Sequence, residues 1–479
     1  MNNVFRTGVF RLSTVSAAGL ILAGCASVNF DQALVESNET TRGFTGGRLE
    51  LSQSDRQRQS REALSAQLLA KPLTMDDAVQ LALANSPSMQ ALLAQSWADL
   101  AAANQAGRIA NPIFNFERTR IGGELELARL LSVGLLDILT LPQRQTIARN
   151  QVAQAKVQLS VGVVEQVGQI RQAWVRAVAA RQTLGYADQV SRTAQASAEL
   201  AKRMQQVGNF TKLQRARQQV FYADAAAQLA SARHADTAAR EELVRQLGLN
   251  DAQAGQLTLP DRLPDLPNEP RGPAEVSAAA TQQRLDVQLA RLQLEAAGRS
   301  QRLKLLGSLV DVELGARHDT VFEKSTGERA NRNGYELGIR LPVFDWGGAQ
   351  RAAMNAQSLA AANRYDSVVR SASSQLRESY SAYRTAYDLA RHYRDEIVPL
   401  RKTMAEENVL RYNGMLIGVF ELLADTRDQI ASVMAAINAQ QQFWLADAGL
   451  SASVIGKPMA MGAMPMGSSA AAGSQGAGH

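Results

Sequence analysis

The sequence repeats itself at an interval of about 200 residues. The segment Leu83–Gln95 has a degenerate counterpart in Thr281–Gln293, and Leu139–Gln151 has another in Ile339–Gln357. Both matches keep nearly the same offset, and a Leu-Pro pair recurs in the second of them. A chain built in this way is expected to fold as two copies of one unit.

Each copy predicts the same order of elements: a helix, two strands, a long helix, a turn and a second long helix. From Thr146 to about Gln206 there is no proline, and apolar residues recur every three to four residues. A run of about 60 residues spans roughly 90 Å as an α-helix, which favours a coiled coil over the alternative of a core stripe in a large helical bundle. The rhythm is carried by Val163, Val167, Ile170 and Trp174 in the first copy, and by Leu376, Tyr380, Tyr383, Tyr387, Ile397, Leu400 and Met404 in the second.

Strand pairs are expected just before the long helices. In Ser308–Phe322 and Tyr335–Phe344, apolar and charged residues alternate, with a polar loop expected over residues 323–333. Such alternation over about ten residues is typical of a membrane β-barrel with a wet lumen, and a soluble sandwich is the alternative. One face would carry Val310, Val312, Leu314, Ala316, Tyr335, Leu337, Ile339 and Leu341, and the other Asp311, Glu313, Arg317, Asp319, Glu336 and Arg340.

The first strand pair, in Pro112–Arg120 and Glu124–Pro142, alternates less cleanly, because Arg129 and Asp137 fall on its mostly apolar face. Two pairs make four strands, whereas the smallest membrane barrels need about eight. The pattern therefore implies an oligomer.

The composition agrees with an elongated, helix-rich protein. Aromatic residues make up only 5% of the chain, and the formal net charge is a modest +6, with no concentrated basic stripe. Nucleic acid is therefore not expected as a partner. After the first 24 residues there is no run of 18 or more apolar residues that would predict a transmembrane helix.

The single cysteine lies in the sequence Leu-Ala-Gly-Cys, at Cys25, directly after a basic and then apolar N-terminal stretch. A lone cysteine in an exported chain has no internal disulfide partner. The four residues resemble the bacterial lipobox, in which the chain is cut before the cysteine and its sulfur is acylated. Acyl chains would hold the N-terminus in a membrane leaflet. A chance cysteine at an ordinary signal cleavage site is the alternative.

Together these features divide the chain into six expected segments. In order they are a signal peptide (1–24), a lipidated N-terminal segment (25–72), the first repeat (73–258), a Pro-rich linker (259–273), the second repeat (274–450) and a disordered tail rich in Met, Gly and Ala (451–479).

From Leu73 to Leu450 the chain resembles the TolC-type outer-membrane factors, also called the outer-membrane efflux protein family. The stretches that carry the resemblance, in the family's order, are Leu73–Pro87, Ala110-Asn111-Pro112, Gly208–Leu249, Leu341–Gln357 and Arg411–Gln429. The resemblance implies a mainly helical fold in which a homotrimer builds one twelve-stranded outer-membrane β-barrel and a long periplasmic coiled-coil tunnel.

The resemblance also implies a passive duct that works with a periplasmic adaptor and an inner-membrane pump, in contact with outer-membrane lipid, without a cofactor and without enzymatic activity. The sequence agrees, because His234, His318, His392 and His479 are scattered and no metalloprotease, phosphate-loop or nucleophile motif is present.

A duct of this family closes at the periplasmic end, which in this sequence corresponds to Gly418–Asp425. Glu421 falls where the family often has a gate acid, and Glu421 and Asp425 are the expected gate residues. Repeated three times around a narrow axis, such carboxylates repel one another unless they are protonated or bound to cations. The alternative is that both are solvated, or paired within the helix to Arg427.

The turns that join the long helices are the expected adaptor contacts. They comprise Gly208, Asn209, Phe210, Thr211 and Lys212 in the first, and Met415, Leu416, Ile417 and Gly418 in the second. Glycines 208, 414 and 418 would permit reversal, and exposed Phe210, Met415, Leu416 and Ile417 would need a partner. The family often has glycine where Met415 stands. The alternative is that these residues pack the tunnel end of the trimer itself.

The tail offers one candidate metal site. Met459, Met461, Met464 and Met466 are closely spaced, and thioethers suit Cu(I), although chance clustering is the alternative. The function predicted is export of small toxic substrates, including heavy-metal ions such as copper. A duct for type I protein secretion and a structural coiled-coil lipoprotein are the alternatives.

Overall fold

The structure is a computed structural model that describes residues 30–122, 124–309, 311–323, 327–340 and 343–456. Cys25 and the four methionines of the tail lie outside these residues. Among the described residues, no helix is both long enough and apolar enough to cross a membrane.

The chain divides into two compact units. Among the described residues, unit 1 takes residues 30–37, 93–160 and 286–370, and unit 2 takes residues 38–92, 161–285 and 371–456. Each unit therefore combines residues from both copies of the sequence repeat. The order of elements recurs as expected, since a helix, two strands and long helices follow one another twice.

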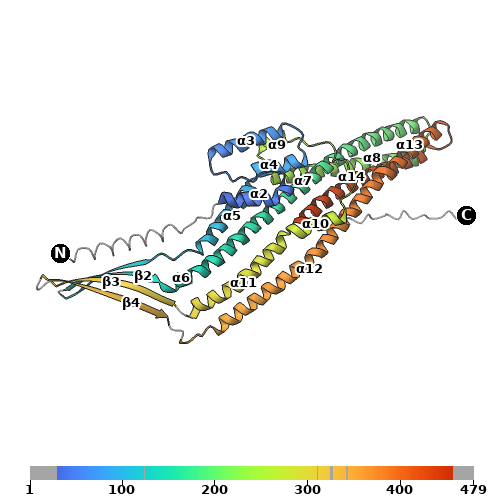
Figure 1. The fold of residues 1–479 in the computed structure, drawn as a ribbon. Coiled ribbons are helices and arrows are strands. Elements are labelled where there is room, and N and C mark those ends of the chain that lie inside the picture. Colours follow the sequence, from blue (N-terminus) through green and yellow to red (C-terminus); the bar gives the residue numbers. More distant parts are fainter. Residues whose placement is uncertain (1–29, 123, 310, 324–326, 341–342, 457–479) are drawn as a thin grey trace. The chain divides into compact units, whose positions relative to one another are not determined.

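Unit 1 contains a four-stranded antiparallel sheet in the order β1-β2-β3-β4 (Figure 1). Strands β1 and β4 each pair on one side only, so the described part of the sheet has two open edges. The strands are β1 (Ile113–Ile121), β2 (Glu124–Gly134), β3 (Asp311–Glu323) and β4 (Arg329–Arg340).

The register confirms the alternation predicted for β3 and β4. Residues directly opposite each other in an antiparallel pair place their side chains on the same face. Val312 lies opposite Ile339, and Leu314 lies opposite Leu337, so apolar residues meet apolar residues across the two strands.

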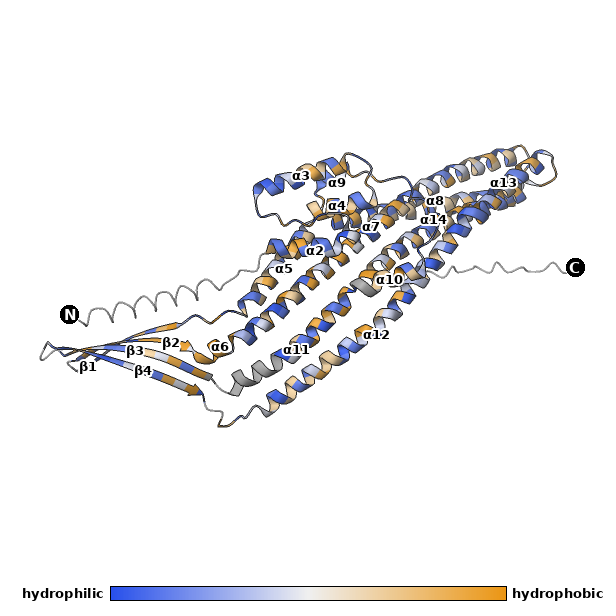
Figure 2. Ribbon diagram, viewed as in Figure 1, coloured by the Kyte–Doolittle hydropathy of each residue, from blue (hydrophilic) through white to orange (hydrophobic). Residues whose placement is uncertain are grey.

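Two expectations for this region are wrong. The polar loop expected over residues 323–333 is shorter, because β4 already begins at Arg329. The hydrogen bonds between strands join backbone groups, so exposed polar residues can also belong to a strand. Asp137 is not on a strand but on the short helix α6 (Leu135–Leu139). Its carboxylate accepts a 2.7 Å hydrogen bond from the Arg144 guanidinium. Figure 2 shows the hydrophobic residues of β2 and α6 in this part of the chain.

Five helices have residues in both units. They are α2 (Phe30–Thr45), α5 (Pro87–Gln105), α7 (Leu141–Gln206), α11 (Leu285–Leu309) and α12 (Gly348–His392). The first copy's predicted rhythm is confirmed, because Val163, Val167, Ile170 and Trp174 of α7 are all buried.

The segment 25–72 contains helices that the sequence analysis did not predict. Besides α2, it contains α3 (Asp55–Leu69). Ser54 caps the N-terminus of α3. The ring of Phe30 stacks on Trp97 with centroids 5.7 Å apart, and Lys156 Nζ lies 2.6 Å from a Glu36 carboxylate oxygen. The start of α2 is therefore packed against unit 1.

The remaining helices belong to unit 2. They are α4 (Met75–Asn85), α8 (Lys212–Leu247), α9 (Asp251–Gln256), α10 (Pro273–Gln283), α13 (Val398–Asn413) and α14 (Val419–Ile455). Helix α14 continues through residues 451–455, which we expected to belong to the disordered tail.

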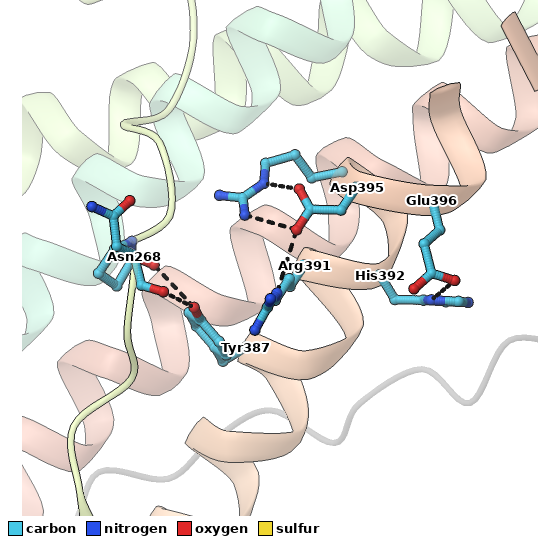
Figure 3. A network of polar contacts seen from close by, with 8 residues as sticks. Asn268, Tyr387, Arg391, His392, Asp395 and Glu396 are labelled. Atoms are coloured by element: carbon cyan, nitrogen blue, oxygen red, sulfur yellow. Dashed lines mark hydrogen bonds and ion pairs between the residues drawn. The ribbon is translucent and has the colours of Figure 1, made fainter. Parts of the chain in front are cut away.

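The Pro-rich linker is packed onto an aromatic cluster of unit 2. The ring of Phe443 lies 5.6 Å from that of Tyr383 and 5.7 Å from that of Tyr387. Leu266 of the linker is buried in the same cluster. The Tyr387 hydroxyl donates to the Asn268 carbonyl oxygen at 2.9 Å (Figure 3). The linker is thus a fixed strap and not a loose tether.

A π-helical segment, Tyr393–Ile397, separates α12 from α13. Pro399 explains the π-helical segment. Proline has no N–H to donate to the preceding helical turn, and its ring clashes with the backbone of that turn. The wider π turn leaves room for the ring and does not need the missing hydrogen bond. Two hydrogen bonds from Arg394, 2.6 and 3.0 Å long, lower the pKa of the Asp395 carboxyl, and Arg391 adds a third bond (Figure 3).

The second copy therefore departs from the uninterrupted rhythm that we expected. Tyr383 and Tyr387 are buried, but Leu400 and Met404, beyond the π segment, are exposed in the single chain.

Candidate functional site

The first long-helix turn joins α7 to α8. Gly208 has a φ of 85°, in the left-handed region that glycine adopts at little steric cost. The Asn209 N–H donates to the Met204 carbonyl at 2.9 Å. Thr211 is the N-cap of α8 and accepts a hydrogen bond from the backbone N–H of Gln214. Gly208 and Thr211 thus fix the shape of the turn.

The second turn joins α13 to α14 and reverses the chain without a left-handed glycine. We expected Gly414 and Gly418 to permit the reversal, but their φ values are −78° and −83°. Met415 takes the positive φ instead, at 57°. The Leu416 N–H then donates to the Arg411 carbonyl at 2.8 Å, which closes the end of α13.

Exposure at the turns agrees with the prediction for two residues and corrects it for two. Met415 and Leu416 are 93% and 74% exposed, as expected. Ile417 is only 8% exposed, and Phe210 is half-buried. Ile417 and Phe210 therefore add less exposed apolar area to the candidate contact surface than we expected. Lys212 and Gly418 are exposed.

Two further apolar residues at the first turn were missed. Val207 and Leu213 are both more than half exposed. They flank the turn on either side, and the signal was present in the sequence, since each is an isolated apolar residue among polar ones. We define the hairpin-end patch as Val207, Leu213, Met415 and Leu416.

Both turns lie at the same end of unit 2 (Figure 1). The Arg427 guanidinium of α14 lies 4.5 Å from the ring centroid of Phe221 on α8 and donates to the Arg217 carbonyl oxygen at 3.4 Å. Arg217 and Arg427 each follow their turn within about three helical turns. Helices α8 and α14 therefore leave the two turns side by side.

The two expected gate acids have different surroundings. Glu421 lies in the first turn of α14, is exposed, and forms no ion pair with a described residue. Asp425 is half-buried and accepts a short hydrogen bond from the side-chain amide of Asn408, which is itself buried.

The alternative in which Asp425 pairs with Arg427 is not what the structure shows. The Arg427 side chain is engaged with α8, and residues two apart on a helix point in different directions.

One face of the sheet carries every strand carboxylate whose side chain the structure describes. The register places Glu117, Glu124, Glu126, Glu313, Asp319, Glu323 and Glu336 on a single face, which we call the acid face, together with Arg317, Arg332 and Arg340. Arg317 lies 2.8 Å from a carboxylate oxygen of Asp319 and 3.9 Å from one of Glu126. This face can hold water and ions, whereas the opposite face carries most of the apolar residues of the strands.

Aromatic side chains follow the end of β4. Phe344 and Trp346 are both largely exposed, as is Val343. Exposed aromatic residues at the ends of strands are typical of a membrane–water interface.

The other predicted site residues cannot be placed. Cys25 and residues Met459, Met461, Met464 and Met466 lie outside the described part of the chain. Within that part, there is no group of three or more His, Cys, Asp or Glu side chains arranged to hold a metal ion.

No protein-family model matches the sequence, and no curated protein matches it. Solved structures do match. The outer membrane protein VceC of Vibrio cholerae has a TM-score of 0.65 at 16% identity, over 80% of this chain and 97% of the other. The outer membrane channel CmeC of Campylobacter jejuni has a TM-score of 0.68 at 13% identity, over 86% and 89%.

A structure of the open state of the outer membrane channel MtrE of Neisseria gonorrhoeae has a TM-score of 0.63 at 16% identity, over 80% of this chain and 89% of the other. The chain thus has the fold of outer-membrane channels, mainly helical with four strands per chain. The resemblance to TolC-type outer-membrane factors holds at the level of the fold.

Proposed function

We propose that the protein is a TolC-type outer-membrane factor: the homotrimeric exit duct of a tripartite efflux pump, through which small toxic substrates pass without chemical change. The observation that carries the proposal is the sheet. The sheet has two open edges. One face carries the described carboxylates of the strands, and the opposite face carries none and holds most of the apolar residues, on a fold shared with outer-membrane channels.

The open edges support the trimer. An exposed strand edge pairs readily with another chain, and a closed barrel removes every edge. Three copies of four strands give 3 × 4 = 12 strands, within the range of membrane barrels. The acid face then lines the lumen and the opposite face meets lipid. Leu400 and Met404, exposed in the single chain, are covered by helices of neighbouring protomers.

The gate is formed by Glu421. Its carboxylate is exposed near the end of unit 2 where the chain reverses, and a three-fold axis would bring three copies together. Asp425 contributes less to the gate than Glu421, because its carboxylate already accepts a hydrogen bond from the Asn408 side-chain amide.

The hairpin-end patch is the contact for a periplasmic adaptor, which links the duct to an inner-membrane pump. An apolar side chain as exposed as that of Met415 is stabilised when a partner covers it. The adaptor is expected to cover Met415 and Leu416 first and Val207 and Leu213 next.

Conductance in planar lipid bilayers tests the duct. The purified protein should form discrete ion-conducting pores, and a strain that lacks the gene should become more sensitive to toxic compounds. If the protein binds membranes without forming pores, it is the structural coiled-coil lipoprotein. If the deletion blocks secretion of a protein and leaves drug sensitivity unchanged, the duct serves type I secretion.

The N-terminus is held in the outer membrane by acyl chains on Cys25. Cys25→Ala should abolish incorporation of labelled fatty acid, while the apolar face of the sheet still allows insertion. Cys25→Ser serves as the matched control and should behave in the same way. Mass spectrometry that finds an unmodified N-terminus on the wild-type protein would exclude the anchor.

The substrates include heavy-metal ions such as copper. Support comes from the four methionines between positions 459 and 466, whose thioethers suit Cu(I). Removal of residues 457–479 should lower copper tolerance and leave tolerance of organic compounds unchanged. Equal tolerance of copper with and without the tail would remove copper from the proposal.

A further inference from the structure

The two faces of the sheet differ in their charges. The acid face holds the seven Asp and Glu residues of the strands whose side chains the structure describes, together with three arginines. The opposite face, which we call the cationic face, holds no Asp or Glu in the described strands. It carries four arginines: Arg118, Arg120, Arg129 and Arg329.

The register places these arginines together. Arg129 lies opposite Phe116 on one side and His318 on the other, Arg120 lies opposite Leu125, and Arg329 lies opposite Phe322. These pairs occupy the half of each strand that is nearer the hairpin turns.

The other half of the cationic face is apolar. Phe114, Leu131, Ala316 and Tyr335 form one row across the four strands, and Val133, Leu314 and Leu337 form the next. The face therefore changes along the strands from an apolar band to an arginine band.

The arginines of this band have no acidic partner. Arg118, Arg120 and Arg329 are exposed, and none of the four forms an ion pair with a described carboxylate. Arg129 donates to the Thr320 hydroxyl at 3.4 Å, and the Arg329 guanidinium lies 5.7 Å from the Phe322 ring centroid. On the acid face, by contrast, Arg317 is paired with Asp319.

Further polar side chains accompany the arginines. His318 Nδ1 lies 2.6 Å from the Asn333 side-chain oxygen, and the Thr320 hydroxyl lies 3.2 Å from the Asn331 side-chain oxygen. Thr320 is fully buried, whereas Asn331 and Asn333 are exposed. Exposed amide side chains suit the hydroxyl groups of a sugar, as guanidinium groups suit phosphate.

We propose that the arginine band binds the phosphate groups of a phosphorylated glycolipid in the membrane leaflet at the hairpin-turn end of the sheet. The inference rests on the proposed function, because it needs the cationic face to meet lipid. Unpaired arginines on a lipid-facing surface are costly in hydrocarbon and favourable beside anionic headgroups. The acyl chains of the same lipid would cover the apolar band, so that one ligand matches both halves of the face.

The test uses the full mature protein, stripped of lipid in mild detergent, and bis-phosphorylated lipid A as the probe. Bound lipid is counted by native mass spectrometry. Arg329→Gln is compared with Arg332→Gln, three residues along the same strand but on the acid face. Each arginine beside an anionic lipid surface is worth about a fivefold change in affinity. Arg329→Gln should therefore weaken binding about fivefold, and the triple variant Arg118→Gln, Arg120→Gln, Arg329→Gln on the order of 100-fold.

Three further results decide the proposal. Arg332→Gln should bind lipid A like the wild type, dephosphorylated lipid A should bind weakly to every form, and inorganic phosphate at the same concentration should not displace the lipid. Equal loss in Arg329→Gln and Arg332→Gln, equal binding of the dephosphorylated lipid, or displacement by phosphate alone would overturn it.

Pore formation is measured on the same preparations, so that the two proposals fail separately. The triple variant should still conduct, because the acid face is unchanged. If the wild-type protein binds lipid A through the arginines but no preparation conducts, the duct is wrong while the lipid site stands. If pores form and binding is insensitive to the arginines, only the lipid site is wrong.

Discussion

Met415 holds the single positive φ found among the described non-glycine residues, and it does so with an exposed apolar side chain. A non-glycine residue in the left-handed region costs about 1–2 kcal/mol. Met415→Gly should therefore be more stable than Met415→Ala by about 1 kcal/mol, because only glycine relieves the backbone strain. Urea unfolding of the two variants in detergent measures the difference.

The same pair of variants separates stability from binding. Both remove the exposed thioether, so both should bind the adaptor more weakly, and to a similar extent. If Met415→Ala were the more stable of the two, the left-handed turn at this position would be wrong.

Glu421 and Asp425 provide a second comparison between single residues. Glu421→Gln should weaken cation block of single-channel current from the periplasmic side, since it removes three exposed charges from a proposed trimer gate. Asp425→Asn should do less, because the Asn408 amide already binds that carboxylate. Recordings in planar bilayers with divalent cations measure the block. Equal block in the wild type and both variants would place the constriction elsewhere.

At the scale of the elements, the two faces of β4 should respond differently to the same substitution. Leu337 lies on the face proposed to meet lipid, and its neighbour Glu336 on the acid face. Leu337→Lys should cost about 2–4 kcal/mol near the middle of the membrane, whereas Glu336→Lys should leave insertion intact and alter ion selectivity. The fraction of trimer recovered from outer membranes measures insertion. A reversed order of effects would mean that the faces are assigned the wrong way round.

Two elements show how a local chemical constraint is absorbed. Pro399 breaks the hydrogen-bond ladder of the helix, and the π segment Tyr393–Ile397 absorbs the break without ending the rod. The prolines of the linker prevent it from forming a helix. The buried side chain of Leu266 and the hydrogen bond from the Tyr387 hydroxyl then hold the linker against the core of unit 2.

For the whole molecule, the open edges of the sheet predict association. In mild detergent the protein should run as a trimer by light scattering, with circular dichroism dominated by helix and a minor strand signal. Glu336→Lys, which leaves the sheet edges intact, is the control and should also be trimeric. A stable monomer that does not associate with membranes would contradict the architecture.

Much of the fold could be predicted from local sequence signals. The repeat, the rhythm of α7 and the alternation in β3 and β4 depend on residue order alone, because helix and strand periodicity place each side chain on a known face. The four α7 residues Val163, Val167, Ile170 and Trp174 are buried, and Val312 and Leu314 meet apolar partners, as predicted. Gly208 was also predictable, since a tight turn at that point needs a left-handed residue.

Other features depend on neighbours that are distant in the sequence. The sequence could not predict that Asp425 accepts a hydrogen bond from Asn408, or that Arg427 lies over the ring of Phe221, because those partners lie on other helices. Ile417 and Phe210 were expected to be exposed because residues of turns usually are, yet Ile417 is buried and Phe210 is half-buried, and the local sequence does not encode this difference. The gathering of the carboxylates on one face emerged only from strand register, because a shift of one residue in any of the three pairings would have spread them over both faces.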